Sequence, residues 1–178
     1  WTTRRRERLN RPWRRWFGGT GWRIDSPRRI CASAIGHGWG TSMCGPATNY
    51  RRVNVSKDGF PFTAAGQIPV LMDQFERDVL RRNTPCNFVE RSALVHALAE
   101  THVELVLIHP FRDGNGRVAR LLSTLMALQA GLPLLDFRVI AGERKTAYIA
   151  AIQVGLEKNY AHMERLFAEI IEQSPETS

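Results

Sequence analysis

One short stretch carries most of the side chains in this sequence that could do chemistry together. It reads His109-Pro110-Phe111-Arg112-Asp113-Gly114-Asn115-Gly116-Arg117, and Arg120 follows three positions later. An imidazole has a pKa near neutrality and can accept a proton. A carboxylate such as Asp113 is a hard oxygen ligand that suits Mg²⁺, and arginines bind phosphate oxygens. The stretch therefore predicts a site with a base, a metal ligand and phosphate-binding groups.

The backbone of this stretch is also suited to bind an anion. Gly114 and Gly116 are expected to let the chain turn tightly and to expose its N–H groups. A helix then begins at about Asn115, so that its N-terminal partial positive charge points into the loop. Arg117 and Arg120 are three positions apart, fall on one side of the first helical turn and can reach the same anion.

Each of these residues also has a plain structural explanation when it is taken alone. Asp113 to Gly116 would be a turn, and Arg117 and Arg120 would form a solvated helix face. His109 would be a residue at the C-terminal end of a helix, where the helix dipole favours it. These explanations would have to coincide within twelve positions of the chain. We therefore interpret the stretch as a functional site.

The elements that position this site are expected to be helices. Apolar spacings of three and four predict helices at about 68–82, 89–108, 115–130, 143–157 and 159–173. The site then lies in the loop between the second and third helix, and Pro110 helps to end the second one. The inward side of the third helix is predicted to carry Leu121, Leu122, Leu125 and Leu128.

One β-hairpin is expected before the helices. Residues 51–56 alternate as in a strand, Lys57, Asp58 and Gly59 are turn residues, and Phe60-Pro61-Phe62 follows. Pro61 should limit how regular the second strand can be. The fold class is thus all-α, a compact helical domain over residues 50–178 that carries one short hairpin.

The charge of the chain is concentrated in its first quarter. The net charge is +8 over 178 residues, and no apolar run reaches the roughly 20 residues of a membrane-spanning helix. Residues 1–49 hold ten arginines against Glu7 and Asp25, together with all five tryptophans and half the glycines, whereas residues 50–178 are neutral. The composition therefore indicates nucleic acid as a partner only if residues 1–49 bind it.

Three interpretations of residues 1–49 remain open. The segment could be a disordered basic arm, an RNA- or membrane-binding segment in which Arg and Trp contact phosphate and stack, or a stretch that is not the native coding frame. We favour an inert or non-native segment, and we disfavour nucleic acid and membrane as partners. Cys31, Cys44 and Cys86 have no CxxC spacing and leave one thiol unpaired, which favours a reduced, cytoplasmic setting.

Residues 109–120 resemble the motif of Fic domain proteins, His-x-Phe-x-(Asp/Glu)-Gly-Asn-Gly-Arg-x-x-Arg, at all eight specified positions. A looser likeness runs from about residue 50 to residue 173. The resemblance implies a compact helical fold whose β-hairpin, about 51–62, is a flap over the active-site loop 109–117. It also implies a protein adenylyltransferase, which transfers AMP from ATP to a Ser, Thr or Tyr hydroxyl of a target protein and releases pyrophosphate.

The resemblance assigns a role to each residue of the motif. His109 would be the general base, and Phe111 would anchor the loop in the core. Asp113 would hold Mg²⁺ on the phosphates. The anion cradle would be formed by Gly114, Asn115 and Gly116, with Arg117 on the β-phosphate and Arg120 on the γ-phosphate. His102 resembles a histidine often found at this place in the family, and we interpret it as structural.

The resemblance also implies partners and leaves alternatives. A target segment could dock along the flap as an added strand, although a plain edge hairpin that covers the core explains the pattern equally well. No complete inhibitory (Ser/Thr)-x-x-x-(Glu/Asp)-(Gly/Asn) match occurs, because Arg8 follows Thr3 and Glu7. Inhibition would then come from a separate antitoxin-like partner, from a segment outside this chain, or would not occur.

Other functions compete with transfer of AMP. A phosphotransferase of the same superfamily has lysine in place of the second motif glycine, so Gly116 argues against it. A related transferase could move another phosphate-linked group, because the motif does not fix the nucleotide. A nucleic-acid-binding protein is the non-enzyme alternative, and it depends wholly on residues 1–49.

Overall fold

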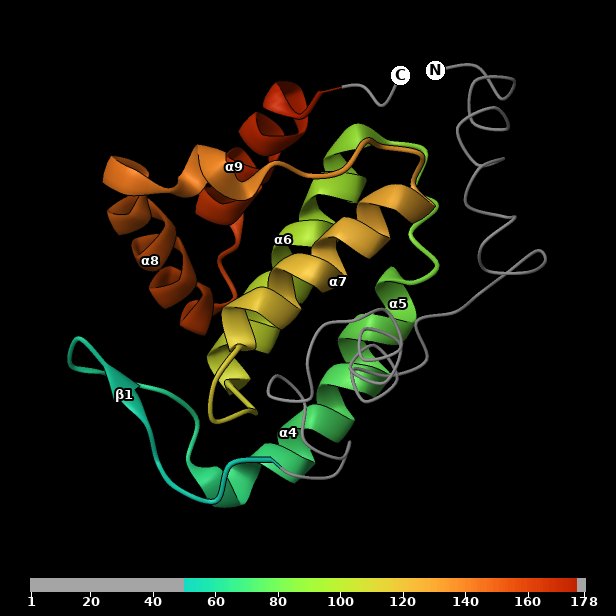
Figure 1. Ribbon diagram of the computed structural model, residues 1–178. Coiled ribbons are helices and arrows are strands. Elements are labelled where there is room, and N and C mark those ends of the chain that lie inside the picture. The colour runs from blue at the N-terminus through green and yellow to red at the C-terminus, as the bar shows by residue number, and fades with distance from the viewer. Residues whose placement is uncertain (1–49, 176–178) are drawn as a thin grey trace, which may run out of the picture.

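The structure, a computed structural model, describes residues 50–175 (Figure 1). The segment 1–49, which we expected to be disordered or non-native, lies outside the described residues. Within the described part, the fold is helical with one two-stranded antiparallel sheet. The predicted fold class is therefore confirmed. None of the described helices combines the length and apolar character needed to cross a bilayer.

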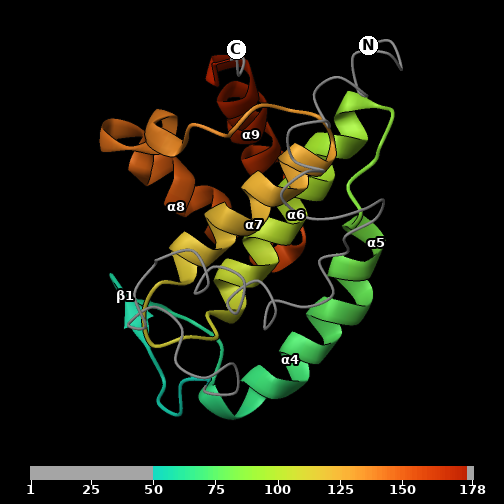
Figure 2. The same ribbon diagram turned by 45° about the vertical axis from the view of Figure 1, so that its right-hand side comes forward.

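The centre of the fold is a pair of helices that lie side by side, α6 (Arg91–Ile108) and α7 (Asn115–Gln129) (Figures 1 and 2). Helix α6 also contacts α9, so it is covered on several sides. Accordingly its buried residues, among them Leu94, Leu98, Val103 and Leu105, are distributed around most of its circumference. The short connection from α6 to α7 is the motif loop, which the two helices hold at one end of the molecule.

Between the hairpin and α6, residues 65–83 form one long helical rod. It consists of a 3₁₀ turn (Ala65–Gln67), α4 (Ile68–Gln74), a wider π-helical stretch (Phe75–Leu80) and α5 (Arg81–Asn83). The predicted helix at about 68–82 is thus present but is not a regular α-helix throughout. Its apolar face packs into the core through Ile68, Met72 and Phe75, each at most 2% exposed.

The C-terminal part covers the other side of α6. After α7, two 3₁₀ turns (Phe137–Ile140 and Gly142–Arg144) lead into α8 (Lys145–Val154). A third 3₁₀ turn (Gly155–Glu157) then precedes α9 (Ala161–Gln173). Helix α9 buries the predicted set of Met163, Leu166, Phe167, Ile170 and Ile171.

The hairpin is shorter than the sequence predicts. Strand β1 is Ser56–Lys57 and β2 is Phe60–Pro61, with the pairs Ser56↔Pro61 and Lys57↔Phe60. Residues 51–55 are not a strand, because the carbonyls of Val53 and Thr63 accept hydrogen bonds from the Arg51 side chain. Figures 1 and 2 place the hairpin at the same end as the α6–α7 loop.

Two further sequence predictions were wrong. Helix α6 begins at Arg91, and Val89, expected within it, is 88% exposed. Leu121, predicted to face inward, is 37% exposed. The inner face of α7 carries smaller residues beside Leu122 and Met126, namely Val118, Ala119, Ser123 and Ala127. These small side chains let α7 lie close to α6. Leu122 is fully buried and Leu125 packs against the core, as predicted, whereas Leu121 lies outside the packed face.

Candidate active site

His109 closes α6 in a left-handed conformation, with φ 50° and ψ 57°. Its amide still donates to the carbonyl of Leu105 at 3.2 Å, which caps the helix end. The following Pro110 excludes a right-handed continuation at this position, as the sequence predicted. Residues other than glycine rarely adopt positive φ, so the fold holds the side chain of His109 in an unusual direction out of the helix end.

The imidazole of His109 is fixed on two sides. Its Nδ1 lies 3.1 Å from the carbonyl oxygen of Val106. Because a carbonyl can only accept, Nδ1 carries a proton, and in the neutral ring Nε2 then keeps the lone pair. The ring of Phe62, from the hairpin, stacks on the imidazole at 3.7 Å between centroids and 20° between planes. The geometry thus makes Nε2 the basic atom of the neutral ring.

The surroundings favour this neutral form. Burial lowers the pKa of His109 below its usual value, and the positive charges of Arg51 and Lys57 lower it further. The hydrogen bond to Val106 and the carboxylate of Asp113 act in the opposite direction and do not reverse the shift. A base with a lowered pKa is available to accept a proton at neutral pH.

The loop after His109 is closed by the side chain of Asn115. Its Oδ1 accepts from the amide of Phe111 at 2.8 Å, and its Nδ2 donates to the carbonyl of Phe111 at 2.8 Å. Asn115 is 2% exposed, so these bonds replace water. Phe111 packs against the core, as expected, with its ring centroid 6.3 Å from that of Tyr50. The loop is therefore fixed at both of its ends.

The predicted anion cradle is the start of α7. The first amide bonded within the helix is that of Val118, to Gly114 at 2.9 Å. The amides of Asn115, Gly116 and Arg117 precede it and have no helical acceptor. Gly114 has φ 84°, a value that favours glycine. The tight turn expected at Gly116 is not found, because this residue is already helical within α7.

Both motif arginines fold back over these glycines. A Cβ built on Gly114 would lie 3.5 Å from Nη2 of Arg117, and one built on Gly116 would lie 3.8 Å from Nη1 of Arg120. The structure thus brings the two guanidinium groups and the free amides to the same helix start, where partial and full positive charges add. Such a concentration of positive charge is suited to bind an anion.

Asp113 and Arg117 form an ion pair of 2.7 Å, in which their side chains are 88% and 43% exposed. An ion pair this exposed contributes about 0–1 kcal/mol, so an incoming ligand can replace it at small cost. Groups of three or more potential metal-binding side chains are absent from residues 50–175. Mg²⁺ can, however, be held by one carboxylate and substrate phosphates, and the exposed carboxylate of Asp113 fits that requirement.

His102 is a structural residue, as we interpreted it. The side chain is fully buried, with Nδ1 3.0 Å from Ser123 Oγ and Nε2 2.8 Å from the Tyr148 hydroxyl. Ser123 donates its own proton to Ala119, so Nδ1–H donates to Ser123 and Nε2 accepts from Tyr148. Burial lowers the pKa of His102 to about 3, and the charge of Arg120 contributes to this shift.

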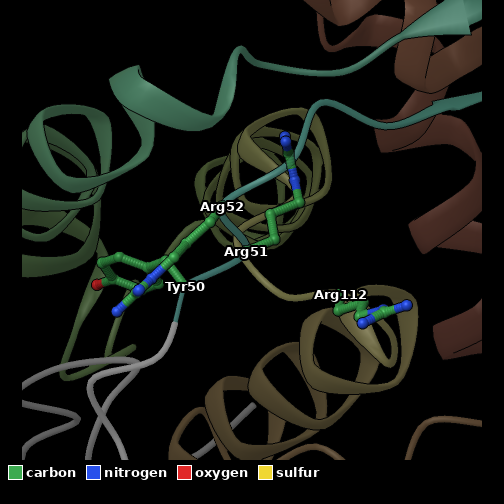
Figure 3. A pocket seen from close by; sticks show the side chains of 4 residues that line it. All are labelled: Tyr50, Arg51, Arg52 and Arg112. Carbon is green, nitrogen blue, oxygen red and sulfur yellow. The ribbon is translucent and has the colours of Figure 1, made fainter.

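Sequence reasoning missed two supports of the site, Arg51 and Phe62. Both fell within the expected hairpin, and strand alternation gave no sign that Arg51 would be buried. An open pocket of about 470 Å³ is lined by Tyr50, Arg51, Arg52 and Arg112, whose side chains are drawn in Figure 3. Of the motif, only Arg112 lines this pocket, so it is distinct from the cradle at the start of α7.

The sequence of this chain is similar to those of known proteins. The sequence model of the Fic/DOC family matches residues 29–127, starting 21 residues before Tyr50, where the likeness had been expected to begin. Two relatives are named protein adenylyltransferase Fic, from Culex quinquefasciatus (31% identical over 128 residues) and Aedes aegypti (31% over 125). Each match covers 70% of this chain and 23% of the relative. The chain thus spans about a quarter of the length of these curated relatives.

Solved structures share the fold. The Bep8 FIC domain from Bartonella sp. 1-1C has a TM-score of 0.65 at 19% identity, covering 96% of this chain and 82% of that one. The BepC protein from Bartonella tribocorum, crystallised with AMPPNP, has a TM-score of 0.60 at 22% identity, covering 94% and 84%. An ADP-bound Fic domain from Bartonella quintana is 30% identical, covers 66% and 54%, and has a TM-score of 0.55. On its motif, its fold and these matches, the chain belongs to the Fic/DOC family.

Proposed function

We propose that this protein is a protein adenylyltransferase, which transfers AMP from ATP to a Ser, Thr or Tyr hydroxyl of a target protein and releases pyrophosphate. The observation that carries the proposal is the junction of α6 and α7. There a neutral histidine presents the lone pair of Nε2 beside a helix start with two arginines folded over it. Relatives named protein adenylyltransferase and neighbours crystallised with AMPPNP or ADP support the choice of nucleotide.

The phosphates of ATP would occupy the start of α7. The free amides of Asn115 and Gly116, after the left-handed turn at Gly114, would bind phosphate oxygens. Arg117 would bind the β-phosphate and Arg120 the γ-phosphate. Mg²⁺ held by Asp113 would neutralise phosphate charge. Arg117 would exchange its exposed ion pair with Asp113 for the phosphate, and this exchange costs little.

The reaction needs one proton transfer and one displacement. Nε2 of His109 would accept the proton of the target hydroxyl as its oxygen bonds to the α-phosphorus. The bond from the α-phosphorus to the bridging oxygen of the β-phosphate breaks, and Arg117 and Arg120 stabilise the charge that develops on pyrophosphate. Positioning supplies most of the acceleration, because no covalent enzyme intermediate is needed.

The target would dock along the flap. The two strands of the hairpin pair only with each other, over two residues each. An extended target segment could therefore add to an outer edge and place its hydroxyl beside His109. A separate antitoxin-like inhibitor and a cytoplasmic setting stay predictions from the sequence.

The test uses the full chain, a cell lysate, Mg²⁺ and ATP labelled at either the α- or the γ-phosphate. Label from the α position should appear on protein and be lost in His109→Ala. His162→Ala is the matched control, since His162 is exposed on α9, and it should transfer normally. Label transferred only from the γ position would favour kinase chemistry, and absence of transfer by folded protein would contradict the proposal.

A further inference from the structure

Arg51 is a buried arginine whose hydrogen bonds join three segments of the chain. The residue is 5% exposed. Its Nε donates to the carbonyl of His109 at 2.8 Å, Nη1 donates to Val53 at 2.7 Å, and Nη2 donates to Thr63. Its backbone amide donates to Pro110 at 2.9 Å. Figure 3 shows its side chain extending toward the hairpin, away from those of Arg52 and Arg112.

These acceptors belong to the two parts of the site that must be held together. Val53 lies in the leg that enters the hairpin and Thr63 in the leg that leaves it, whereas His109 and Pro110 begin the motif loop. A guanidinium is planar and presents its donors in a rigid fork. One side chain therefore fixes the spacing of both hairpin legs from the carbonyl of His109.

The hairpin in turn sets the imidazole. Phe62, next to Thr63, stacks on the ring of His109 at 3.7 Å. The amide of Thr63 also lies 3.5 Å from the carbonyl of Leu107, which reinforces the same attachment. If the hydrogen bond from Arg51 to the carbonyl of Thr63 were lost, Phe62 and the docking edge of the hairpin would move relative to Nε2 of His109.

We propose that Arg51 is a positioning residue that locks the flap to the active-site loop, so that the imidazole of His109 and a docked target segment keep a fixed relative position. The assignment rests on the proposed function, because it takes His109 as the base and the hairpin as the docking edge. The side-chain donors of Arg51 bond backbone carbonyls, so its effect on the reaction would be exerted through His109 and the hairpin.

The pKa of His109 is a second observable that distinguishes a positioning role of Arg51 from a role confined to stability. The positive charge of Arg51 is one of the causes that lower the pKa of His109. A neutral residue in its place should therefore raise the pKa of that imidazole. A lysine should leave the charge in place while losing the fork that reaches three carbonyls. The two substitutions thus separate charge from geometry.

The experiment compares Arg51→Met and Arg51→Lys in the full chain with Arg165→Met, a change at an exposed arginine of α9 outside the flap and the motif loop. Thermal unfolding identifies the folded variants. NMR follows the titration of the His109 imidazole and its nuclear Overhauser effects to the Phe62 ring. Transfer of label from α-labelled ATP to lysate protein gives the initial rate, and ATP binding is measured separately.

We expect Arg51→Lys to lose about tenfold or more in target transfer, with nucleotide affinity within about twofold and weaker Phe62–His109 contacts. Arg51→Met should add a raised His109 pKa, while Arg165→Met should match the unsubstituted chain in every measurement. If Arg51→Met does not fold, the results for Arg51→Lys alone test the proposal. Normal transfer and normal Phe62–His109 contacts in Arg51→Lys would overturn the proposal.

The failure of the proposed function would look different. If the unsubstituted chain transfers no label from α-labelled ATP, the adenylyltransferase proposal fails. The Phe62–His109 contacts and the imidazole titration need no substrate, so they still decide whether Arg51 holds the flap against the loop.

Discussion

Replacing Asn115 by alanine tests whether one side chain fixes the motif loop. Asn115 makes two hydrogen bonds of 2.8 Å to the amide and carbonyl of Phe111. Each such bond contributes about 1 kcal/mol net, and a buried group left without a partner costs about 1–3 kcal/mol. Phe111 is only half-buried, so water will satisfy part of what is lost. Alanine also gains about 0.5 kcal/mol of helix propensity at the start of α7.

The expected net loss in the free energy of unfolding is therefore about 2 kcal/mol, or a fall in Tm of roughly 4–8 °C for a chain of this size. Asn87→Ala, at an exposed loop position, is the control and should change stability by less than about 0.5 kcal/mol. Thermal unfolding followed by circular dichroism measures both. Transfer activity should fall by about 10- to 100-fold, because the loop between His109 and the start of α7 loses its closure.

Asn115→Asp tests the two hydrogen bonds of this side chain separately. A carboxylate keeps the acceptor for the Phe111 amide but places negative charge against the Phe111 carbonyl, so destabilisation should match or exceed that of alanine at neutral pH. Protonation at acidic pH restores a donor and should recover part of the difference between the two variants. Both variants unfolding within about 1 °C of the unsubstituted chain would refute the assignment of Asn115 as the closure of the loop.

Four further outcomes follow from the site. The acid limb of the pH profile of kcat/KM should lie below pH 6.5, because burial lowers the pKa of His109 and the base is lost only below that value; a limb above pH 6.5 would contradict it. Phe62→Leu should lower kcat with little change in Tm, since it removes a ring that stacks on His109 at 3.7 Å; unchanged kcat would count against this. Asp113→Ala should raise the Mg²⁺ concentration for half-maximal transfer by about tenfold, measured by titration after chelation; an unchanged requirement would exclude Asp113 as ligand. The free energy of unfolding should fall as the pH drops from 6.5 toward 3, because His102 binds a proton there in the unfolded chain but not in the folded one, where its pKa is about 3. Urea unfolding at pH 7 and at pH 4.5 measures this loss, which should be about 2.5 kcal/mol larger than in His102→Gln.

Local spacing was sufficient to predict the elements around the motif. Pro110 and Gly114 act on the backbone of their own neighbourhood, so the end of α6 and the turn before α7 follow from residue types alone. Apolar spacing predicted the five helical regions for the same reason, and it placed the motif between the second and third. These features depend on contacts within a few residues, which a sequence pattern records directly.

The supports of the site depend on contacts that no local pattern records. Arg51 bonds a carbonyl 58 positions away, and nothing in residues 51–56 indicates a buried cation. Leu121 fits the apolar spacing but faces outward, because the helix packs through its smaller residues. Helix rotation is decided by the partner surface, and the spacing of leucines alone could not give it.

The hydrogen bonds that orient the site share one property, which is that they join a side chain to backbone atoms rather than to another side chain. His109 is held by the carbonyl of Val106, Asn115 by both polar groups of Phe111, and Arg51 by three carbonyls. Backbone groups are present whatever residue occupies the position, so these contacts persist when neighbouring side chains change. The hairpin is joined to the base in two ways, by the Phe62 ring that stacks on His109 and by Arg51, whose side chain bonds both hairpin legs and the carbonyl of His109.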